Sequence, residues 1–443
     1  MRKAQNNSKY RFYEFFAGAG MARLGLEPDW DCLWANDNDP KKVEIYEHLH
    51  GVGHIDSRDI SIVSDSIITD HRVLHGDVCP PFPRGADMAW ASFPCQDLSL
   101  AGRQRGMSAK RSGAYWPFWS ILYELMKTGE RPPVVVLENV KGLLYGNSFR
   151  GLCESLVALN MRFGAIVLDA KHFVPQSRPR VFVVAVDADM DLSGLELKSS
   201  EHSAVKPNAL REAFDILPNK VKEKWVWWDL GRLPVNAQTF SEFFLPDPND
   251  VKYDPQPRTK RLLSLMSPCN RSKVQEAERK EGLQIGLLYR RTREGQQRAE
   301  VRFDGLAGCL RTPRGGSSRQ VVVVVQGRKV RTRLLSRIEA ARLMGIQLDN
   351  EGWLPEKGLS FFPPGFSYND SYMALGDGVV VPAVKYLNNK LLLELAKRGR
   401  ESCLKGKSQG KQNCKHSKNC AHLKNVDRHI AAVWRLCWRT PGN

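Results

Sequence analysis

Short apolar segments alternate with helical patterns over the first 187 residues of the chain. The segments are rich in aliphatic and aromatic residues, as the buried strands of a parallel sheet are. They lie at residues 11–17 (RFYEFFA), 32–37 (CLWAND), 87–94 (DMAWASFP), 133–140 (PVVVLENV) and 180–186 (RVFVVAV). Between them, amphipathic stretches such as Trp119–Lys127 and Leu152–Leu159 predict helices. This alternation predicts an α/β domain over residues 10–187, with a doubly wound, Rossmann-like sheet and right-handed crossovers.

The alternation of apolar segments and helical patterns ends after this domain. Proline, glycine and arginine become frequent over residues 188–365, which predicts a smaller, irregular second domain. Near its end, Arg333–Ile346 (RLLSRIEAARLMGI) has the apolar spacing of a helix. Residues 366–395 predict a loop and then a helix that returns to the first domain. The tryptophans of the second segment are expected in the core of the small domain rather than on a stacking platform: Trp225, Trp227 and Trp228.

Basic residues exceed acidic ones across the chain. The 443 residues include 66 Lys and Arg against 48 Asp and Glu, a net charge of +18. Such an excess favours polyanionic partners such as nucleic acid, but it suits a passive binder as well as an enzyme. More than half of it lies in a basic tail at residues 396–443, which carries a net +10. A solvated tail is one interpretation, and contact with a nucleic-acid backbone is the alternative.

Composition argues against two other classes of protein. The longest aliphatic run, Val321–Val325, is far shorter than the roughly 20 residues of a membrane helix, and the N-terminus lacks a signal-peptide core. We therefore expect a cytoplasmic protein without a membrane partner. The ten cysteines follow no disulfide framework, so reduced thiols are expected. One group in the tail could ligate zinc but matches no common finger, so no metal is expected: Cys414, His416, Cys420 and His422.

The first candidate site is the turn at residues 16–20 (FAGAG), which follows the first predicted strand. Its glycines let the backbone approach a ligand and leave helix N-terminal donors available. Asp37 ends the second predicted strand, where a doubly wound sheet places an acid to accept ribose hydroxyls. Together they predict a nucleoside-containing cofactor, and the lack of a full GxGxxG argues against a dinucleotide.

A cysteine and a glutamate follow two neighbouring predicted strands. Cys95 comes directly after Pro94, which cannot donate to a strand ladder, so the thiol is expected on a loop at the carboxyl edge of the sheet. Basic residues in the following loop would lower the pKa of this thiol. Glu138 ends the next predicted strand at the same edge. The pair suggests a nucleophile and a proton donor, although most isolated pairs of this kind are a structural cysteine and a helix-capping acid.

In their order along the chain, these motifs closely resemble those of the bacterial and phage DNA (cytosine-5) methyltransferases. FAGAG resembles the family's adenosylmethionine-binding turn, Pro94-Cys95-Gln96 its nucleophile motif and Glu138-Asn139-Val140 its proton-donor motif. The segment 176–180 (QSRPR) matches the family's QxRxR, and 333–345 resembles the helix before the return to the catalytic domain. Gly376-Asp377-Gly378-Val379 stands where the family usually has GNSV. Six motifs in one order make coincidence negligible.

The resemblance implies a covalent mechanism. The Cys95 thiolate would attack C6 of cytosine, and Glu138 would protonate or hydrogen-bond N3. Arg178 and Arg180 belong to the implied catalytic set, with Arg180 on the cytosine O2. The target base would be flipped out of duplex DNA into the pocket. The loop Ser99–Tyr115 has the composition of a closing flap over that base, with an ordinary surface loop as the alternative.

The resemblance also implies S-adenosyl-L-methionine as cofactor. The methionine part of the cofactor would lie against the FAGAG turn and the C-terminal motif at 376–379. In the nucleoside part, Asp37 would bind the ribose and Asp77 the adenine amine. The residues at the methionine end are Phe16, Gly18, Gly20, Asp377 and Gly378. Some positions depart from the family pattern: Glu14 for Asp, Met21 for Gly, Asn38 for an apolar residue, and Asp377-Gly378 for Asn-Ser. None removes a group that the chemistry requires.

Residues 188–365 occupy the place of the family's target-recognition domain. Arginines at 290–293 and 311–314 could contact guanine in the major groove or hold phosphates, and the second is the more common use. The resemblance implies that the partner is double-stranded DNA and that the protein acts in the bacterial cytoplasm. It also implies that the protein is a monomer. Any restriction endonuclease would be a separate protein. The alternatives are a tRNA cytosine-5 methyltransferase and a catalytically silent DNA-binding relative.

Overall fold

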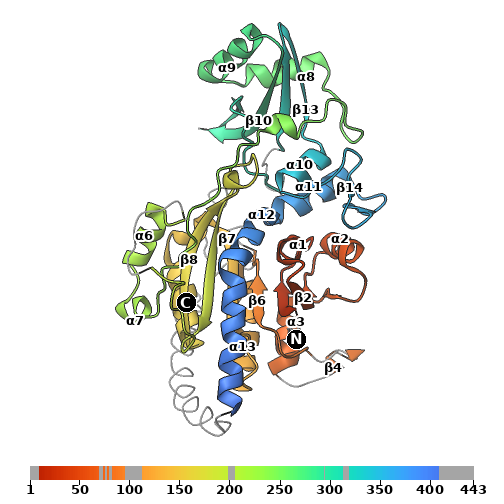
Figure 1. Cartoon of the computed structure of the whole chain (residues 1–443). Coiled ribbons are helices and arrows are strands. Elements are labelled where there is room, and N and C mark those ends of the chain that lie inside the picture. Colours follow the sequence, from red (N-terminus) through yellow and green to blue (C-terminus); the bar gives the residue numbers. More distant parts are fainter. Residues whose placement is uncertain are drawn as a thin grey trace, which may run out of the picture.

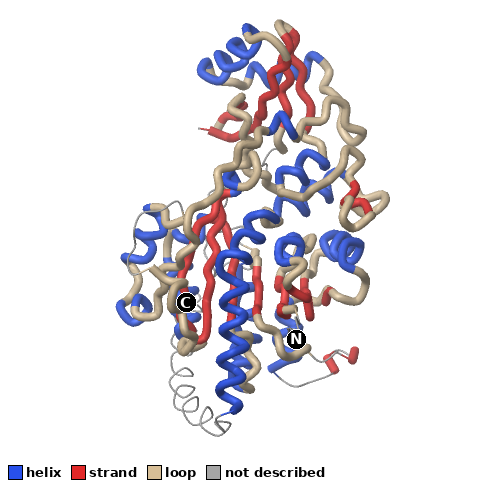
Figure 2. The backbone as a smooth tube through the Cα atoms, in the orientation of Figure 1, coloured by secondary structure: helices blue, strands red, loops and turns tan. Residues whose placement is uncertain are grey.

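The computed structural model of the chain has two lobes, a large one built on an extended sheet and a smaller one at its upper end (Figure 1). It describes residues 9–68, 73–74, 77–78, 82–94, 112–197, 205–293, 295–312 and 319–408. The chain enters the small lobe once, returns, and ends its described part along the large sheet (Figure 2).

The large lobe contains a seven-stranded sheet in the order β3-β2-β1-β6-β7-β9-β8. Its strands are β1 (Tyr10–Phe15), β2 (Trp30–Asn36), β3 (Ile55–Asp56), β6 (Met88–Ala91), β7 (Val134–Val140), β8 (Met161–Asp169) and β9 (Pro179–Asp187). Neighbouring strands are parallel except at β9, which runs antiparallel to both β7 and β8. The strand order reverses direction between β1 and β6, and ligands bind at such switch points of doubly wound sheets. The predicted doubly wound α/β fold is confirmed.

Helices cover both faces of this sheet, so its central strands contain runs of successive apolar residues. In β7, Val134 and Val136 join one buried cluster while Val135 and Leu137 join the other. The helices on the first face are α1 (Met21–Leu26), α2 (Pro40–His50), α12 (Val381–Leu387) and α13 (Leu393–Ser408). Those on the second face are α3 (Ile60–Ile68), α4 (Tyr115–Lys127) and α5 (Asn147–Ala158).

The small lobe has its own antiparallel sheet and its own apolar core. The sheet order is β11-β10-β12-β13, and its helices are packed on one side. The elements are α8 (Gln256–Ser264), α9 (Pro268–Arg279), β10 (Leu283–Arg293), β11 (Gln296–Arg302), β12 (Val321–Gln326) and β13 (Lys329–Leu334). The apolar run Val321–Val325 is the central strand β12. This lobe lies within residues 188–365, where the change in composition predicts a second domain.

The predicted place of the tryptophans is wrong in one respect. All three are partly or fully buried, but they pack on the large sheet rather than inside the small domain. The Trp228 Nε1 donates to the carbonyls of Gly164 (3.2 Å) and Val184 (3.3 Å), both in the large sheet. Two short helices of the same segment, α6 (Asn208–Asp215) and α7 (Asn219–Lys222), lie beside β8 (Figure 1). The segment after β9 therefore extends the large lobe before the chain enters the small one.

The segment after β13 corrects two predicted boundaries. The predicted helix at Arg333–Ile346 is a strand end followed by α10 (Arg337–Leu343), because the Ser336 and Glu339 side chains form a capping box that starts the helix later. The predicted loop before the final helix is itself helical, α11 (Tyr368–Asp377), and the chain breaks only at residues 378–380. Two short strands, β14 (Trp353–Leu354) and β15 (Leu359–Ser360), lie between α10 and α11.

The end of the described chain is helical. Helix α13 extends to Ser408 and so includes the first part of the segment predicted as a tail. The Cys and His residues at 414–422 lie outside the described residues. Within the described ranges, no group of three His, Cys, Asp or Glu side chains is arranged to hold a metal ion. Nor does any helix that the structure describes have both the length and the apolar character needed to cross a membrane.

Candidate active site

The carboxyl ends of β1, β6 and β7 meet at one edge of the large sheet. These strands are neighbours and parallel, so the loops after them open on the same side. Cys95 lies outside the described residues, but the segment before it is described as far as Pro94. The Asn139 Nδ2 donates to the carbonyl oxygen of Phe93 at 3.3 Å. The proton-donor motif is thus hydrogen-bonded to the chain two residues before the cysteine.

Glu138 and Arg180 form an ion pair at this edge. The Arg180 Nε lies 3.2 Å from the Glu138 Oε1, and both side chains are mostly buried. The antiparallel register of β7 and β9 places Arg180 opposite Val140, two residues beyond Glu138. Burial raises the pKa of Glu138 above its usual value, although the positive charges of Arg180 and Arg178 act against the shift. The carboxyl therefore holds a proton at higher pH than a solvent-exposed glutamate.

Arg178 faces the protein interior. Its side chain is 1% exposed. The Nη1 donates to the Leu310 carbonyl at 2.6 Å, and the Nη2 donates to the carbonyls of Gly376 (2.8 Å) and Gly378 (2.6 Å). One guanidinium thus joins the QxRxR segment to the end of the small lobe and to the C-terminal motif.

Gln176 of the same segment has a similar role. Its Nε2 donates to the Leu343 carbonyl at 2.7 Å, and its Oε1 accepts from the Leu310 N–H at 2.9 Å. The side chain is fully buried. The segment therefore connects three stretches that are far apart in the sequence.

Cys309 is a residue near this site that sequence motifs did not identify. The Arg178 Nη1 donates to the Cys309 Sγ at 3.3 Å. Burial raises the pKa of this thiol, but the nearby guanidiniums of Arg178 and Arg180 outweigh burial and lower the pKa below its usual value. Cys309 lies in the second segment, outside all six motifs.

The FAGAG turn is held in an unusual backbone conformation. Phe16, Gly18 and Gly20 all have positive φ, at 55°, 59° and 70°. A bulky residue such as Phe16 adopts this region only where its surroundings enforce it, and such positions cluster at ligand sites. A Cβ on Gly20 would lie 2.5 Å from the His50 Nε2, so glycine is required there for space as well as conformation. A Cβ on Gly18 would meet no described atom within 4 Å, which leaves room above the turn.

Asp37 fixes the same turn. Its Oδ2 accepts from the Gly18 N–H at 2.9 Å and its Oδ1 from the Asp39 N–H at 3.0 Å. Burial raises the pKa of this carboxyl above its usual value, against the positive charge of Lys42. The acid and the glycine turn that the sequence pairs are in direct contact.

Glu14 lies behind the turn in a buried polar group. Its Oε1 accepts from the Arg23 N–H at 3.2 Å, and its Oε2 accepts from the Tyr46 hydroxyl at 3.1 Å. Burial raises the pKa of Glu14 to about 7. The glutamate in place of the usual aspartate therefore joins β1, α1 and α2 and does not open toward the site.

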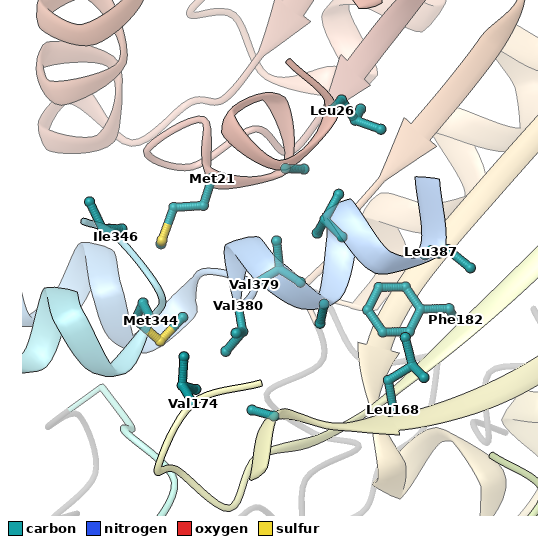
Figure 3. Close-up of a cluster of buried hydrophobic side chains, with 14 of the residues drawn as sticks. Met21, Leu26, Leu168, Val174, Phe182, Met344, Ile346, Val379, Val380 and Leu387 are labelled. Carbon is teal, nitrogen blue, oxygen red and sulfur yellow. The ribbon is translucent and has the colours of Figure 1, made fainter. Parts of the chain in front are cut away.

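Asp377 and Gly378 form the break between α11 and α12, close to the start of α1 and α2. The Asp377 Oδ2 lies 3.0 Å from the Nζ of Lys42, a residue that no motif identified. A Cβ on Gly378 would overlap the Met21 Cε and lie 2.9 Å from its Sδ. Figure 3 shows Met21 pointing from α1 toward the segment that carries Val379 and Val380. Two of the departures from the family pattern, at 21 and 378, are thus in contact.

The structure describes the remaining predicted residues incompletely or not at all. Asp77 begins the two-residue strand β5 (Asp77–Val78), paired with β4 (Val73–Leu74), rather than ending a strand; nothing further is described of its side chain. The loop Ser99–Tyr115 is outside the described residues up to 111. Arg290 and Arg291 lie on β10, with the Arg291 guanidinium 4.5 Å from the centre of the Tyr289 ring. Arg314 is outside the described residues.

The residues at the switch point fit an adenosylmethionine-like ligand. The turn offers an open backbone surface at Gly18, which a side chain would fill. Asp37 accepts from the Gly18 N–H, and both Asp37 and Asp377 act on the charge of Lys42. The side chain of Trp34 on β2 is partly exposed, with its ring 5.0 Å from that of the buried Phe15. A ligand with an aromatic base, hydroxyls and an amino-acid end has complementary groups here.

Comparison with known proteins agrees with this geometry. A family model described as C-5 cytosine-specific DNA methylase matches residues 10–392. The Type II methyltransferase M.HhaI of Haemophilus parahaemolyticus is 30% identical over 191 residues, which cover 42% of this chain and 52% of that protein. The Type II methyltransferase M.BsuFI of Bacillus subtilis is 29% identical over 216 residues, 47% of each protein. The chain spans about half the length of these relatives in the matched regions.

Solved structures show the same fold at low identity. A crystal structure of S. pombe Dnmt2 methyltransferase matches with a TM-score of 0.51 at 16% identity, covering 87% of this chain and 99% of that one. A Spodoptera frugiperda DNMT2 variant matches with a TM-score of 0.54 at 14% identity, covering 88% and 99%. At this identity the likeness concerns the fold alone.

Proposed function

The chain belongs to the C-5 cytosine-specific DNA methylase family, and on that premise we propose that it methylates C5 of cytosine within a specific sequence of double-stranded DNA. S-adenosyl-L-methionine is the cofactor of this family and supplies the methyl group when bound. The residues proposed to hold it are Phe16, Gly18, Gly20, Asp37, Asp77, Asp377 and Gly378.

The observation that carries the proposal is the Glu138–Arg180 pair, beside the backbone that leads to Cys95. Cytosine C5 is a poor nucleophile until a group adds at C6. Addition of the Cys95 thiolate to C6, with proton donation from Glu138 to N3, makes C5 electron-rich. The raised pKa of Glu138 suits this role, because the carboxyl keeps its proton closer to neutral pH.

Arg180 and Arg178 are given different roles. Arg180 pairs with Glu138 and would hold the cytosine O2 as negative charge develops on the ring. Arg178 is proposed as a positioning residue, because its donors are directed to the carbonyls of Leu310, Gly376 and Gly378. Loss of the C5 proton after methyl transfer then expels Cys95 and restores the aromatic ring.

The substrate proposal extends to the second domain and to the partners. A cytosine in duplex DNA is stacked, so it must be flipped out to reach Glu138. The small lobe, within residues 188–365, would read the sequence. We propose that the protein acts as a monomer and that any restriction endonuclease partner is a separate protein.

The test uses the full chain, duplex DNA and methyl-labelled adenosylmethionine. Label on cytosine at one sequence context, located by sequencing for 5-methylcytosine, would support the proposal. Cys95→Ser should abolish transfer, whereas Cys269→Ser, at an exposed position on α9, should leave it intact. Label on tRNA but not DNA would overturn the substrate assignment. DNA binding with no label on either would indicate a silent relative.

A further inference from the structure

Lys42 is a buried cation between two acids of the proposed cofactor site. It lies in the first turn of α2, and its side chain is 20% exposed. Its Nζ is 3.0 Å from the Asp377 Oδ2, and Asp37 and Asp39 also act on its charge. Burial alone would lower the pKa of Lys42, but these carboxylates outweigh burial and raise it, so the ammonium stays charged.

The position of this lysine is otherwise unfavourable. The first turn of a helix carries a partial positive charge, so a cation there is disfavoured unless an anion compensates it. Asp39 already caps α2 by accepting from the Lys41 N–H at 3.0 Å. The partner that reaches Lys42 from another part of the chain is Asp377, which lies 335 positions further on.

Asp377 is held in place from its backbone as well. The carbonyls of the residues on either side, Gly376 and Gly378, both accept from the Arg178 Nη2. Gly376 also packs directly on the backbone of residues 311 and 312. The backbone that carries the Asp377 carboxylate is therefore held in place on both sides.

A fixed carboxylate at this end of the site raises an electrostatic difficulty. The amino-acid part of adenosylmethionine carries its own carboxylate. Two negative groups in a partly buried site repel each other unless a cation lies between or beside them.

We propose that Lys42 is a positioning residue of the cofactor site, which neutralises Asp377 and so lets this end of the site accept the amino-acid carboxylate of the cofactor. This rests on the proposed placement of the cofactor between the FAGAG turn and Asp377. The lysine compensates for the aspartate at 377, and the two residues act as one unit.

The experiment measures equilibrium binding of two probes by calorimetry. S-adenosylhomocysteine has the amino-acid end, whereas 5′-methylthioadenosine has the same nucleoside and lacks that end. Lys42→Met should weaken binding of S-adenosylhomocysteine on the order of tenfold, because the Asp377 carboxylate is then left to repel the carboxylate of the probe, and leave methylthioadenosine within about twofold. Lys41→Met, at the exposed neighbour that pairs with Glu44, is the matched control and should change neither.

The double variant separates compensation from direct contact. Asp377→Asn removes the charge that Lys42 neutralises, so Lys42→Met/Asp377→Asn should recover most of the lost affinity. The proposal is overturned if the double variant binds no better than Lys42→Met, if both probes weaken equally, or if Lys42→Met has no effect.

Two further outcomes have to be distinguished: a wild-type chain that binds neither probe, and a Lys42→Met variant that does not fold. If the wild-type chain binds neither probe, the placement of the cofactor fails, and this outcome differs from failure of the lysine proposal alone. If Lys42→Met does not fold, as judged by thermal denaturation, Lys42→Gln is used in its place. The same recovery by Asp377→Asn is then required.

Discussion

Met21 and Gly378 occupy the same space, and this predicts the cost of replacing the glycine. Gly378→Ser restores the residue that the family pattern would have. The backbone at 378 has φ −75°, so a side chain causes no conformational strain there. Its Cβ would nevertheless overlap the Met21 Cε and approach the Sδ to 2.9 Å, where ordinary contact is about 3.4–4 Å.

The magnitude follows from how little room Met21 has. Its side chain is 2% exposed and packed among core residues (Figure 3), so its end must move into occupied space. Overpacking of this kind costs about 1–3 kcal/mol. For a domain of about 200 residues, 2 kcal/mol corresponds to a thermal midpoint lower by about 4–8 °C.

A double-mutant cycle isolates the contact. Met21→Ala alone leaves a cavity and should cost about 2–5 kcal/mol. In Met21→Ala/Gly378→Ser, the serine enters the space that the methionine has left, so the combined cost should be smaller than the sum by about 2 kcal/mol. The assay is thermal denaturation of the four proteins.

Gly113→Ser is the control for the cycle. A Cβ on Gly113 meets no described atom within 4 Å and that glycine has no positive φ, so little change is expected. Costs that add to within about 0.5 kcal/mol, or a Gly378→Ser protein as stable as the wild type, would refute the reasoning.

Two more predictions concern the charged groups of the site. Arg180→Lys should lower the rate of methyl transfer about 10²–10³-fold and leave the thermal midpoint unchanged. Arg178→Lys should lower the thermal midpoint, because three buried carbonyls lose their fixed donor. Equal thermal midpoints in the two variants would contradict this division of roles. Burial raises the pKa of Glu14 from 4.5 to about 7, so the folded state loses stability relative to the unfolded state as pH rises from 4.5 through 7, by on the order of 3 kcal/mol. Glu14→Gln, which keeps an acceptor for the Tyr46 hydroxyl, should remove that loss in midpoints measured from pH 5 to 8, and a parallel decline in both proteins would count against it.

Five strands of the large sheet could be predicted, because burial on both faces gives them runs of apolar residues: β1, β2, β6, β7 and β9. β8 was harder to identify, since Arg162 and Gly164 interrupt its apolar pattern, and Gly164 is required where Val226 and Trp228 pack against it. The start of α10 could have been found from Ser336 and Glu339, whose spacing is that of a capping box.

Sequence motifs identify some residues of the candidate site and miss others. Glu138, Arg180 and Asp37 are marked by motifs at strand ends, and the structure brings them to one edge. Lys42 is not marked, because its partner is distant in the sequence and a lysine near a helix start has no motif. The inward direction of Arg178 was equally hidden, since it depends on the carbonyls at 310, 376 and 378.

The large lobe is assembled from two separated stretches of chain, and this sets an order on its synthesis. Helices α12 and α13 cover one face of the sheet, where Asn388 accepts from the Trp30 Nε1 at 2.7 Å and Arg400 pairs with Asp87. A ribosome makes this cover only after the whole small lobe. Until then the nascent sheet exposes the apolar groups of α1 and β6 to solvent, which is the condition under which partly folded chains aggregate or engage chaperones. The small lobe, by contrast, has an apolar cluster formed by its own sheet and helices, and all of these residues are made before α12.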